Sequence, residues 1–364
     1  MENEVAIEMS MSYPIEKETL RELMALARRH GVEGLVYNEL LKTPEDLPAG
    51  AITEMRQVSM ATMMSYEQKK AIMRKACAAL DHSVVLKGFG LAELYEQPYL
   101  RSWGDLDIYV GPADYHEAAK RLREAFPEAI HHEEEWEELK HYCFVMPDGN
   151  VIEMHRRTMA LLGKKEQAYF YPLEEDAMRH PQYIDVEGMP IAIPEARFNM
   201  LYVFMHGWEH WYEETGGLKQ LLDIALLCRA SQHVPGIEDY LKEALTHLKL
   251  MEPWQIMGCC LHHVLQLPKE EWWFYKENKR WKYFLGDALE LPKPQPTGKP
   301  NRYEKREQAK KMNVVLRKMV TLWERVAKTA PRIKVCPSYA LRQLWYQILK
   351  GIDRTIHHKA MLDY

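Results

Sequence analysis

Residues 84–110 read VVLKGFGLAELYEQPYLRSWGDLDIYV and end in a strand-like segment that carries two carboxylates. Successive side chains of a strand point to opposite faces, so Asp105 and Asp107 are expected on one face and the alternating apolar residues on the other. Two acids about 7 Å apart along a strand repel each other unless a cation lies between them. The pattern therefore predicts a site for Mg²⁺ (or Mn²⁺), because hard cations prefer carboxylate oxygens and leave room for substrate phosphates.

The segment upstream of this strand has the pattern of a phosphate-binding turn. Residues 84–87 read as a short buried strand, Gly88-Phe89-Gly90 as a glycine turn, and residues 91–95 as the start of a helix. Backbone N–H groups in such a turn point at bound anions. We expect nucleotide phosphates near Lys87 and the amides of Gly88, Phe89 and Gly90, with further contacts from Arg101 and Gly104.

A phosphate-binding turn shortly before an Asp-x-Asp strand resembles the nucleotidyltransferase superfamily, which includes DNA polymerase beta. The closer match is an uncharacterised bacterial nucleotidyltransferase family with a minimal core, and it rests on Leu86-Lys87-Gly88, Leu94-Tyr95, Pro98, Arg101 and Gly104-Asp105-Leu106-Asp107. The resemblance implies an α+β fold, with a small mixed sheet flanked by helices, an N-terminal helical segment and a C-terminal all-helical region. Phe89 departs from the superfamily, which often has Gly or Ser there, and the serine that commonly contacts a phosphate is missing.

A hairpin follows the Asp-x-Asp strand. Two strand-like runs, residues 142–146 and 151–155, flank the turn sequence Pro-Asp-Gly-Asn. On the second run Glu153 shares a face with His155, and Glu153 is the predicted third catalytic carboxylate. The resemblance supports this role, because an acid-hydrophobic-His pattern follows the Asp-x-Asp strand in the family. The alternative is a surface carboxylate paired with Arg156 or Lys140.

The pattern becomes helical from Pro194 onward, with a break at Gly216-Gly217. In the family a helix with an inward His precedes a helix with a Leu-Leu-Asp-Ile-Ala run, and His206 and residues 221–225 match these features. His206, Lys219 and Asp223 are therefore candidate substrate contacts, and the alternative for them is a buried polar group that fixes one helix against the next.

A second motif lies on the first of these helices. His206, Glu209 and His210 match H-x-x-E-H, in which two His at i and i+4 bind Zn²⁺ in inverted zinc peptidases. The motif also needs a distant acidic ligand that the sequence does not identify. A zinc metallopeptidase is thus a lesser alternative.

Length and composition bound the class of protein. The chain has 364 residues, 47% hydrophobic and 28% charged, without a long apolar run or a recognisable signal peptide. Six cysteines without C-x-x-C pairs favour a reducing cytoplasm. We divide the chain into a helical segment (1–80), a nucleotidyltransferase-like α/β core (81–190), a helical domain (191–290) and a basic helical region (301–364) after a Pro-rich linker.

Two apolar stripes have helical spacing. The first is interpreted as core, and the second is expected to have one face buried against this chain, a partner or a membrane. Met60, Met63 and Met64 form the first, and residues 314–326, with Met319 and Trp323, form the second. The second lies in a basic end: residues 299–364 hold 16 Lys/Arg against 5 Asp/Glu. This end is expected to dock on the acidic remainder of the chain, and nucleic-acid binding is a less favoured alternative.

These patterns together predict a metal-dependent nucleotidyltransferase. Asp105, Asp107 and Glu153 would hold the metal, and an NMP group would pass from an NTP, ATP by default, to the hydroxyl of a small molecule or protein. The alternative from another class is a binding or scaffold protein with a catalytically degenerate core.

Overall fold

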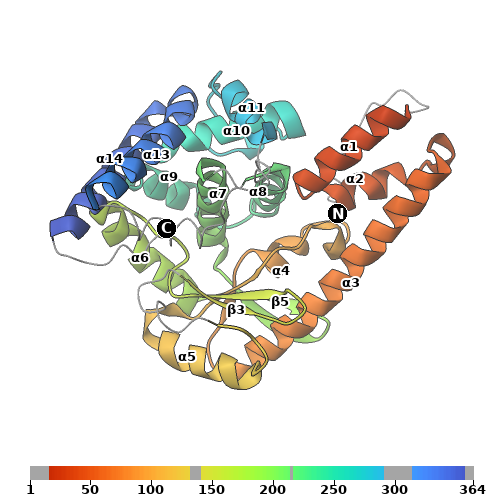
Figure 1. The fold of residues 1–364 in the computed structure, drawn as a ribbon, viewed down its shortest axis with the longest axis horizontal. Helices are drawn as coiled ribbons and strands as arrows, with labels where there is room; N and C mark the ends of the chain where they lie inside the picture. Colours follow the sequence, from red (N-terminus) through yellow and green to blue (C-terminus); the bar gives the residue numbers. More distant parts are fainter. Residues whose placement is uncertain (1–15, 132–140, 214–215, 291–313, 357–364) are drawn as a thin grey trace.

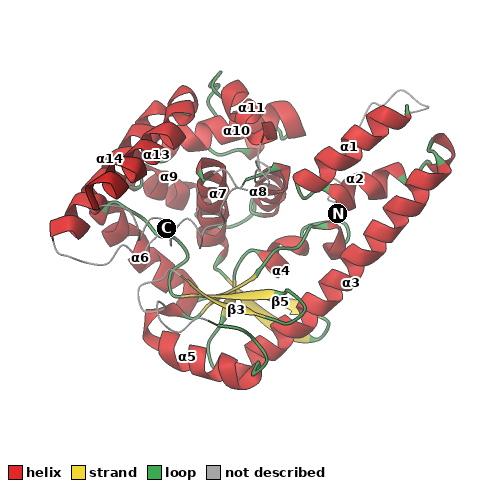
Figure 2. Cartoon of the chain, viewed as in Figure 1, coloured by secondary structure: helices red, strands yellow, loops and turns green. Residues whose placement is uncertain are grey.

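A computed structural model describes residues 16–131, 141–213, 216–290 and 314–356, which form an α+β fold (Figures 1 and 2). The helices are α1 (Lys17–Arg29), α2 (Glu33–Leu40), α3 (Ala49–Ala79), α4 (Gly88–Ala92), α5 (Gly111–Ala125), α6 (Lys164–Arg179), α7 (Ala196–Tyr212), α8 (Leu218–Ala230), α9 (Ile237–His247), α10 (Met251–Leu265), α11 (Trp281–Glu290), α13 (Val314–Val335) and α14 (Pro337–Ile356). The strands are β1 (Val84–Val85), β2 (Leu106–Tyr109), β3 (His141–Val145), β4 (Val151–His155), β5 (Gln182–Val186) and β6 (Met189–Ile193). The predicted linker lies outside the described residues.

The central sheet is mixed and has the strand order β1-β2-β4-β3. β2 pairs antiparallel with β1 and parallel with β4, and β3 closes the predicted hairpin with β4. In Figure 1 the sheet lies between α5 on one side and α7 with other helices on the opposite side. A small mixed sheet flanked by helices is the fold predicted from the sequence.

The two faces of β2 enter different parts of the hydrophobic core. Ile108 is fully buried with residues of α3 and α5, such as Met73 and Leu122. Tyr109 points the other way and belongs to the core that α7 and α8 form. The alternation of the sequence is therefore real, and it leaves the polar face of β2 directed toward the helical region.

Two predicted segments have different bounds in the structure, and one hairpin was not predicted. Residues 88–90 form the first turn of α4 instead of a separate glycine turn. The sequence predicts a turn at residues 111–114 and a helix over 115–126. In the structure α5 already begins at Gly111, because Pro112 is favourable in the first turn of a helix and Gly111 adopts φ 77° just before it. The sequence also failed to indicate the β5–β6 hairpin, whose turn residues Glu187 and Gly188 both have positive φ.

The N-terminal helices α1, α2 and α3 confirm the expected helical segment. The methionine stripe is a correction, because Met60, Met63 and Met64 lie exposed on α3. No other described element covers this part of α3, so apolar residues at helical spacing are not buried here. α3 is buried on either side of this stripe, at Met55 and again nearer its C-terminal end, where Lys69 Nζ donates to Asn150 Oδ1 at 2.7 Å in the β3–β4 turn.

The C-terminal helices α13 and α14 pack on the helical region through one end. Arg332 donates to Asp287 of α11 at 2.9 Å and Lys328 pairs with Glu213, so ion pairs do dock this basic segment. The predicted apolar stripe on α13 is not buried, since Met319 and Trp323 are exposed. Within the described residues, no helix has the length and apolar character needed to cross a membrane.

Candidate functional site

The parallel pairing of β2 with β4 brings the sequence-predicted acids together. Asp107 lies directly opposite Glu153, and Tyr109 lies opposite His155. Asp105 immediately precedes the first residue of β2, so it is exposed, whereas Asp107 within the strand is buried. One exposed and one buried carboxylate thus stand beside a third on the neighbouring strand.

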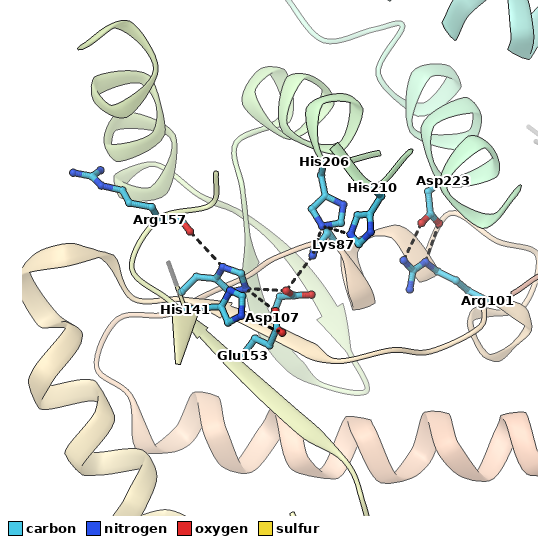
Figure 3. A network of polar contacts seen from close by, with 10 residues as sticks. Lys87, Arg101, Asp107, His141, Glu153, Arg157, His206, His210 and Asp223 are labelled. Carbon is cyan, nitrogen blue, oxygen red and sulfur yellow. Dashed lines mark hydrogen bonds and ion pairs between the residues drawn. The ribbon is translucent and has the colours of Figure 1, made fainter. Parts of the chain in front are cut away.

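Asp107 is neutralised by side chains of the protein itself. Lys87 Nζ donates to Asp107 Oδ1 at 3.0 Å, and His155 Nε2 lies 2.8 Å from the same oxygen (Figure 3). Burial raises the pKa of Asp107, but the charge of Lys87 and the hydrogen bond from His155 outweigh it, so this pKa lies well below its ordinary value. Repulsion between the two acids therefore does not by itself require a metal ion.

Asp105 has the opposite electrostatic environment. Desolvation and the neighbouring charges of Glu153 and Asp107 raise the pKa of Asp105, and Lys69 and Lys87 only partly offset them. The pKa of Glu153 is lowered, because the hydrogen bond from His155 and the charge of His141 overcome the effect of burial. The three carboxylates are close enough to interact, and Asp105 carries the least compensated charge.

Glu153 is not paired with Arg156 as the surface alternative expected, and Lys140 lies outside the described residues. Its Oε1 lies 3.4 Å from His141 Nε2, and its Oε2 lies 3.5 Å from His155 Nε2. Glu153 is half-buried and faces the same group of polar side chains as Asp107 (Figure 3).

Lys87 reaches this site from a strained backbone position. It lies between β1 and α4 with φ 50° and ψ −112°, a conformation that usually requires glycine. A non-glycine residue there costs about 1–3 kcal/mol and persists where the surroundings hold it. The Lys87 amine is held by Asp107 and by His206 Nε2 at 2.8 Å.

The H-x-x-E-H residues do not form a zinc site with a third ligand. His206 Nε2 lies 2.9 Å from His210 Nε2, and the Lys87 amine adjoins His206 (Figure 3). A lysine amine at this position opposes a metal ion, because both would carry positive charge. The described residues hold one group of three side chains with metal-binding geometry, and it does not include this motif.

Arg101 and Asp223 form a buried ion pair away from Asp107. Arg101 Nε and Nη2 donate to the two oxygens of Asp223 at 2.8 and 2.9 Å, and Tyr95 also donates to Asp223 at 2.8 Å. This bidentate pair fixes α8 against the loop before β2. Asp223 is thus part of a buried polar pair, as the structural alternative expected, and its partner is Arg101. Two donors of Arg101 are engaged in this pair.

Lys219 lies one turn before Asp223 on α8 and is half-buried. Its Nζ donates to the carbonyl oxygen of Ser102 at 3.4 Å. Burial and the like charge of Arg101 lower the pKa of Lys219 to about 8, although Asp223 acts in the opposite direction. A role for Lys219 in substrate binding stays a prediction.

The residues of the predicted phosphate turn differ in exposure. Phe89 is fully buried as a whole residue, and its ring packs against Trp103 with ring centroids 4.5 Å apart. Gly90 is half-buried and Gly104 is exposed. Phosphate contacts by residues 88–90 and 104 stay predictions.

Two groups near the carboxylates were missed at the sequence level. His141 faces His155 across the hairpin, and counting the register outward from the Pro-Asp-Gly-Asn turn would have found it. The second group is the buried Glu174 of α6, which accepts from the backbone N–H and hydroxyl of Thr158 at 2.6 Å and from Arg157 at 2.9 Å. No pattern in the sequence indicated this contact.

The Asp-x-Asp pair thus lies at the start of β2, and a further carboxylate lies on the parallel neighbour β4. The model of a family described as uncharacterised nucleotidyltransferase matches residues 16–266, more than half of the chain. The chain belongs to this family. The matched region spans α1 to α10 and includes every candidate residue described above.

Other comparisons add little. No curated protein matches the chain. Among solved structures, the chain is similar to an antigenic nucleotidyltransferase-like protein from Paracoccidioides brasiliensis, with 12% identity over 51% of this chain and 84% of that chain. The TM-score of 0.28 is too low to support an argument.

Proposed function

We propose that this chain is a metal-dependent nucleotidyltransferase that moves an NMP group from an NTP to a hydroxyl acceptor. The observation that carries the proposal is the convergence of Asp105, Asp107 and Glu153 from neighbouring strands in a chain of a nucleotidyltransferase family. ATP is the default donor. The acceptor is a small molecule or a protein, and nucleic acid is less favoured.

The three carboxylates fit a divalent cation. Burial raises the pKa of Asp105, and the negative charges of Glu153 and Asp107 raise it further, which the neighbouring lysines do not balance. A hard divalent ion bound by Asp105 and Asp107 would relieve this repulsion and would neutralise the triphosphate. Mg²⁺ or Mn²⁺ satisfies this donor set.

The chain's own residues would position the reactants. The acceptor oxygen attacks the α-phosphorus in line, the bond from the α-phosphorus to the bridging oxygen breaks, and pyrophosphate leaves. Glu153, with its lowered pKa, is ionised at neutral pH and accepts the proton of the hydroxyl or helps to hold a second ion. Positioning and charge neutralisation supply most of the rate in such a reaction.

Lys87 is the side chain best placed to hold a phosphate. Its amine lies at 3.0 Å from Asp107, where a bound cation would compete with it, and it would then move to the phosphates. The amides of residues 88–90 would assist, but α4 has only five residues, and its dipole alone is a weak attractor. Arg101 would act through Asp223 by fixing the loop that carries Asp105.

The ion pair between Lys87 and Asp107 favours a second candidate function. Lys87 and His155 already neutralise Asp107, as expected if the chain were a binding or scaffold protein with a degenerate core. In that case Mg²⁺ would not displace Lys87. The two functions differ in whether nucleotide binding requires a divalent cation.

The test is isothermal titration of ATP, GTP, CTP and UTP, with and without Mg²⁺, into the wild type and the Asp105→Asn variant. Asp105 is the appropriate target because it is exposed and its replacement leaves the Lys87–Asp107 pair intact. We expect Mg²⁺-dependent binding of one NTP that weakens at least about 10-fold in the variant. Binding that is indifferent to Mg²⁺ and to Asp105 would favour the scaffold. No binding of any NTP to either protein would contradict the transferase and leave the degenerate core as the better candidate.

A further inference from the structure

His141, Glu153 and His155 bring one ligand atom each into a small region at the β3–β4 hairpin. Their ligand atoms all lie within 4.8 Å of one another. His141 Nε2 is 3.4 Å from Glu153 Oε1, and His155 Nε2 is 3.5 Å from Glu153 Oε2. The hairpin register places the two histidines opposite each other.

These separations are those of ligands around one ion. Two atoms that each lie about 2.1 Å from a tetrahedrally coordinated metal are about 3.4 Å apart. The site is also accessible, because the side chain of His141 is 34% exposed while that of His155 is 2% exposed. An ion could therefore enter from the side of His141 and reach a buried imidazole.

The orientation of His155 supports a metal ligand. Its Nδ1 lies 3.3 Å from the carbonyl oxygen of Arg157, which can only accept, so Nδ1 carries a proton. Nε2 then faces Asp107 Oδ1 at 2.8 Å and Glu153 Oε2 at 3.5 Å. Two carboxylates around this nitrogen favour a positive centre there, and a metal ion bound by Nε2 would supply one.

A buried carboxylate holds the segment that orients the His155 ring. Glu174 holds Thr158 and Arg157 through hydrogen bonds of 2.6 and 2.9 Å. These bonds fix the segment after β4 and with it the carbonyl group that orients the His155 ring. Metal-binding histidines commonly have such a carbonyl partner on the other ring nitrogen.

We propose that His141, Glu153 and His155 bind a divalent transition-metal ion, such as Mn²⁺ or Zn²⁺, at a site distinct from the Mg²⁺ position at Asp105 and Asp107. Two imidazoles and one carboxylate favour borderline metals, because Mg²⁺ prefers oxygen ligands alone. Metal binding at this site needs no nucleotide. Only a role of the bound metal as the second ion in nucleotidyl transfer rests on the proposed function.

The test uses the full chain after treatment with a chelator, titrated with Co²⁺, Mn²⁺ and Zn²⁺. Bound metal is measured by elemental analysis, and the visible absorption of Co²⁺ reports nitrogen ligands. The variants are His141→Ala, the double variant His206→Ala/His210→Ala, which removes imidazoles outside the proposed site, and Asp105→Asn. We expect stoichiometric metal in the wild type, in the His206/His210 double variant and in Asp105→Asn, and affinity at least about 10-fold lower in His141→Ala.

Three results would overturn the proposal. One is a wild type that binds none of the three ions. Another is unchanged binding and an unchanged Co²⁺ spectrum in His141→Ala. The third is loss of metal only in the His206/His210 variant. Because Asp105→Asn retains this site but loses the nucleotide site, failure of either proposal is visible separately.

Discussion

Asp107 lies between an amine and an imidazole, whereas Asp105, two residues earlier, has carboxylates among its nearest charges. The chain therefore stabilises the charge of Asp107 and tolerates that of Asp105. A carboxylate whose charge is left uncompensated in the folded protein is suited to bind a cation from solution.

This contrast predicts different costs for two similar substitutions. Asp107→Asn leaves Lys87 without its carboxylate in a largely buried position, and we expect a loss of about 3 kcal/mol in the free energy of unfolding. Asp105→Asn removes repulsion, so it should change stability by less than about 0.5 kcal/mol or raise it slightly. Urea unfolding of the metal-free proteins measures both, and equal losses would contradict this view of the site.

Lys219 predicts a pH dependence of stability. Its pKa is about 8 in the folded chain, against an ordinary value of 10.5. Between these values the unfolded chain binds more protons, so the unfolding free energy should rise with pH in this range. Lys219→Met should reduce that rise and stabilise the protein at neutral pH. A variant with the same slope as the wild type would mean that Lys219 is not desolvated.

Among single residues, the three acids could be predicted from the sequence, but the side chains that contact them could not. Alternation along the strand identified Asp105, Asp107 and Glu153, because side-chain direction in a strand follows directly from position. The contact of Lys87 with Asp107 depends on a backbone conformation, φ 50°, that residue type does not predict. His206 and Asp223 were found through family resemblance, but Arg101 as the partner of Asp223 was not.

The elements meet closely where α2 passes the loop before β2. A Cβ atom added at Gly34 in α2 would overlap the carbonyl oxygen of Leu100, which is backbone and cannot turn aside. We expect Gly34→Ala to destabilise the protein by about 1–3 kcal/mol. Gly50→Ala in α3 is the matched control, because a Cβ there meets nothing within 4 Å. Thermal unfolding of both variants measures the effect, and a neutral Gly34→Ala would contradict the close approach.

The Arg101–Asp223 pair predicts a second effect on element packing. Asp223→Ala leaves a buried guanidinium without its bidentate partner, which should cost about 3–5 kcal/mol in unfolding free energy. The double variant Arg101→Met/Asp223→Leu should recover much of this loss, because it removes both charges. Equal losses in the single and double variants would mean that the pair does not act as a unit.

Elements with strong local signals were predicted well. The hairpin of β3 and β4 has a Pro-Asp-Gly-Asn turn, and its predicted and observed strands differ by one residue at each end of β3. The β5–β6 hairpin was missed because Glu at a left-handed turn position is an unfavourable and uncommon choice. The stripes of α3 and α13 show that periodicity identifies a helix but not whether another element covers it.

The chain consists of the region that matches the family, residues 16–266, and a basic C-terminal segment outside that match. Arg332 is fully buried against Asp287 and the carbonyl oxygen of Trp211, so α13 is part of the folded body. The net charge of the segment was visible in the sequence, whereas its attachment through one end depends on tertiary contacts. The division of the chain into four units stays a proposal.

The most direct test of the central claim is a crystal structure with Mn²⁺ and an ATP analogue whose α,β-bridge resists cleavage, with the anomalous signal used to locate the ions. We predict an ion that is bound by Asp105 and Asp107 and contacts the triphosphate. The Lys87 amine should have moved from Asp107 to a phosphate. An intact Lys87–Asp107 pair, with no ion beside it and the nucleotide elsewhere, would contradict the account.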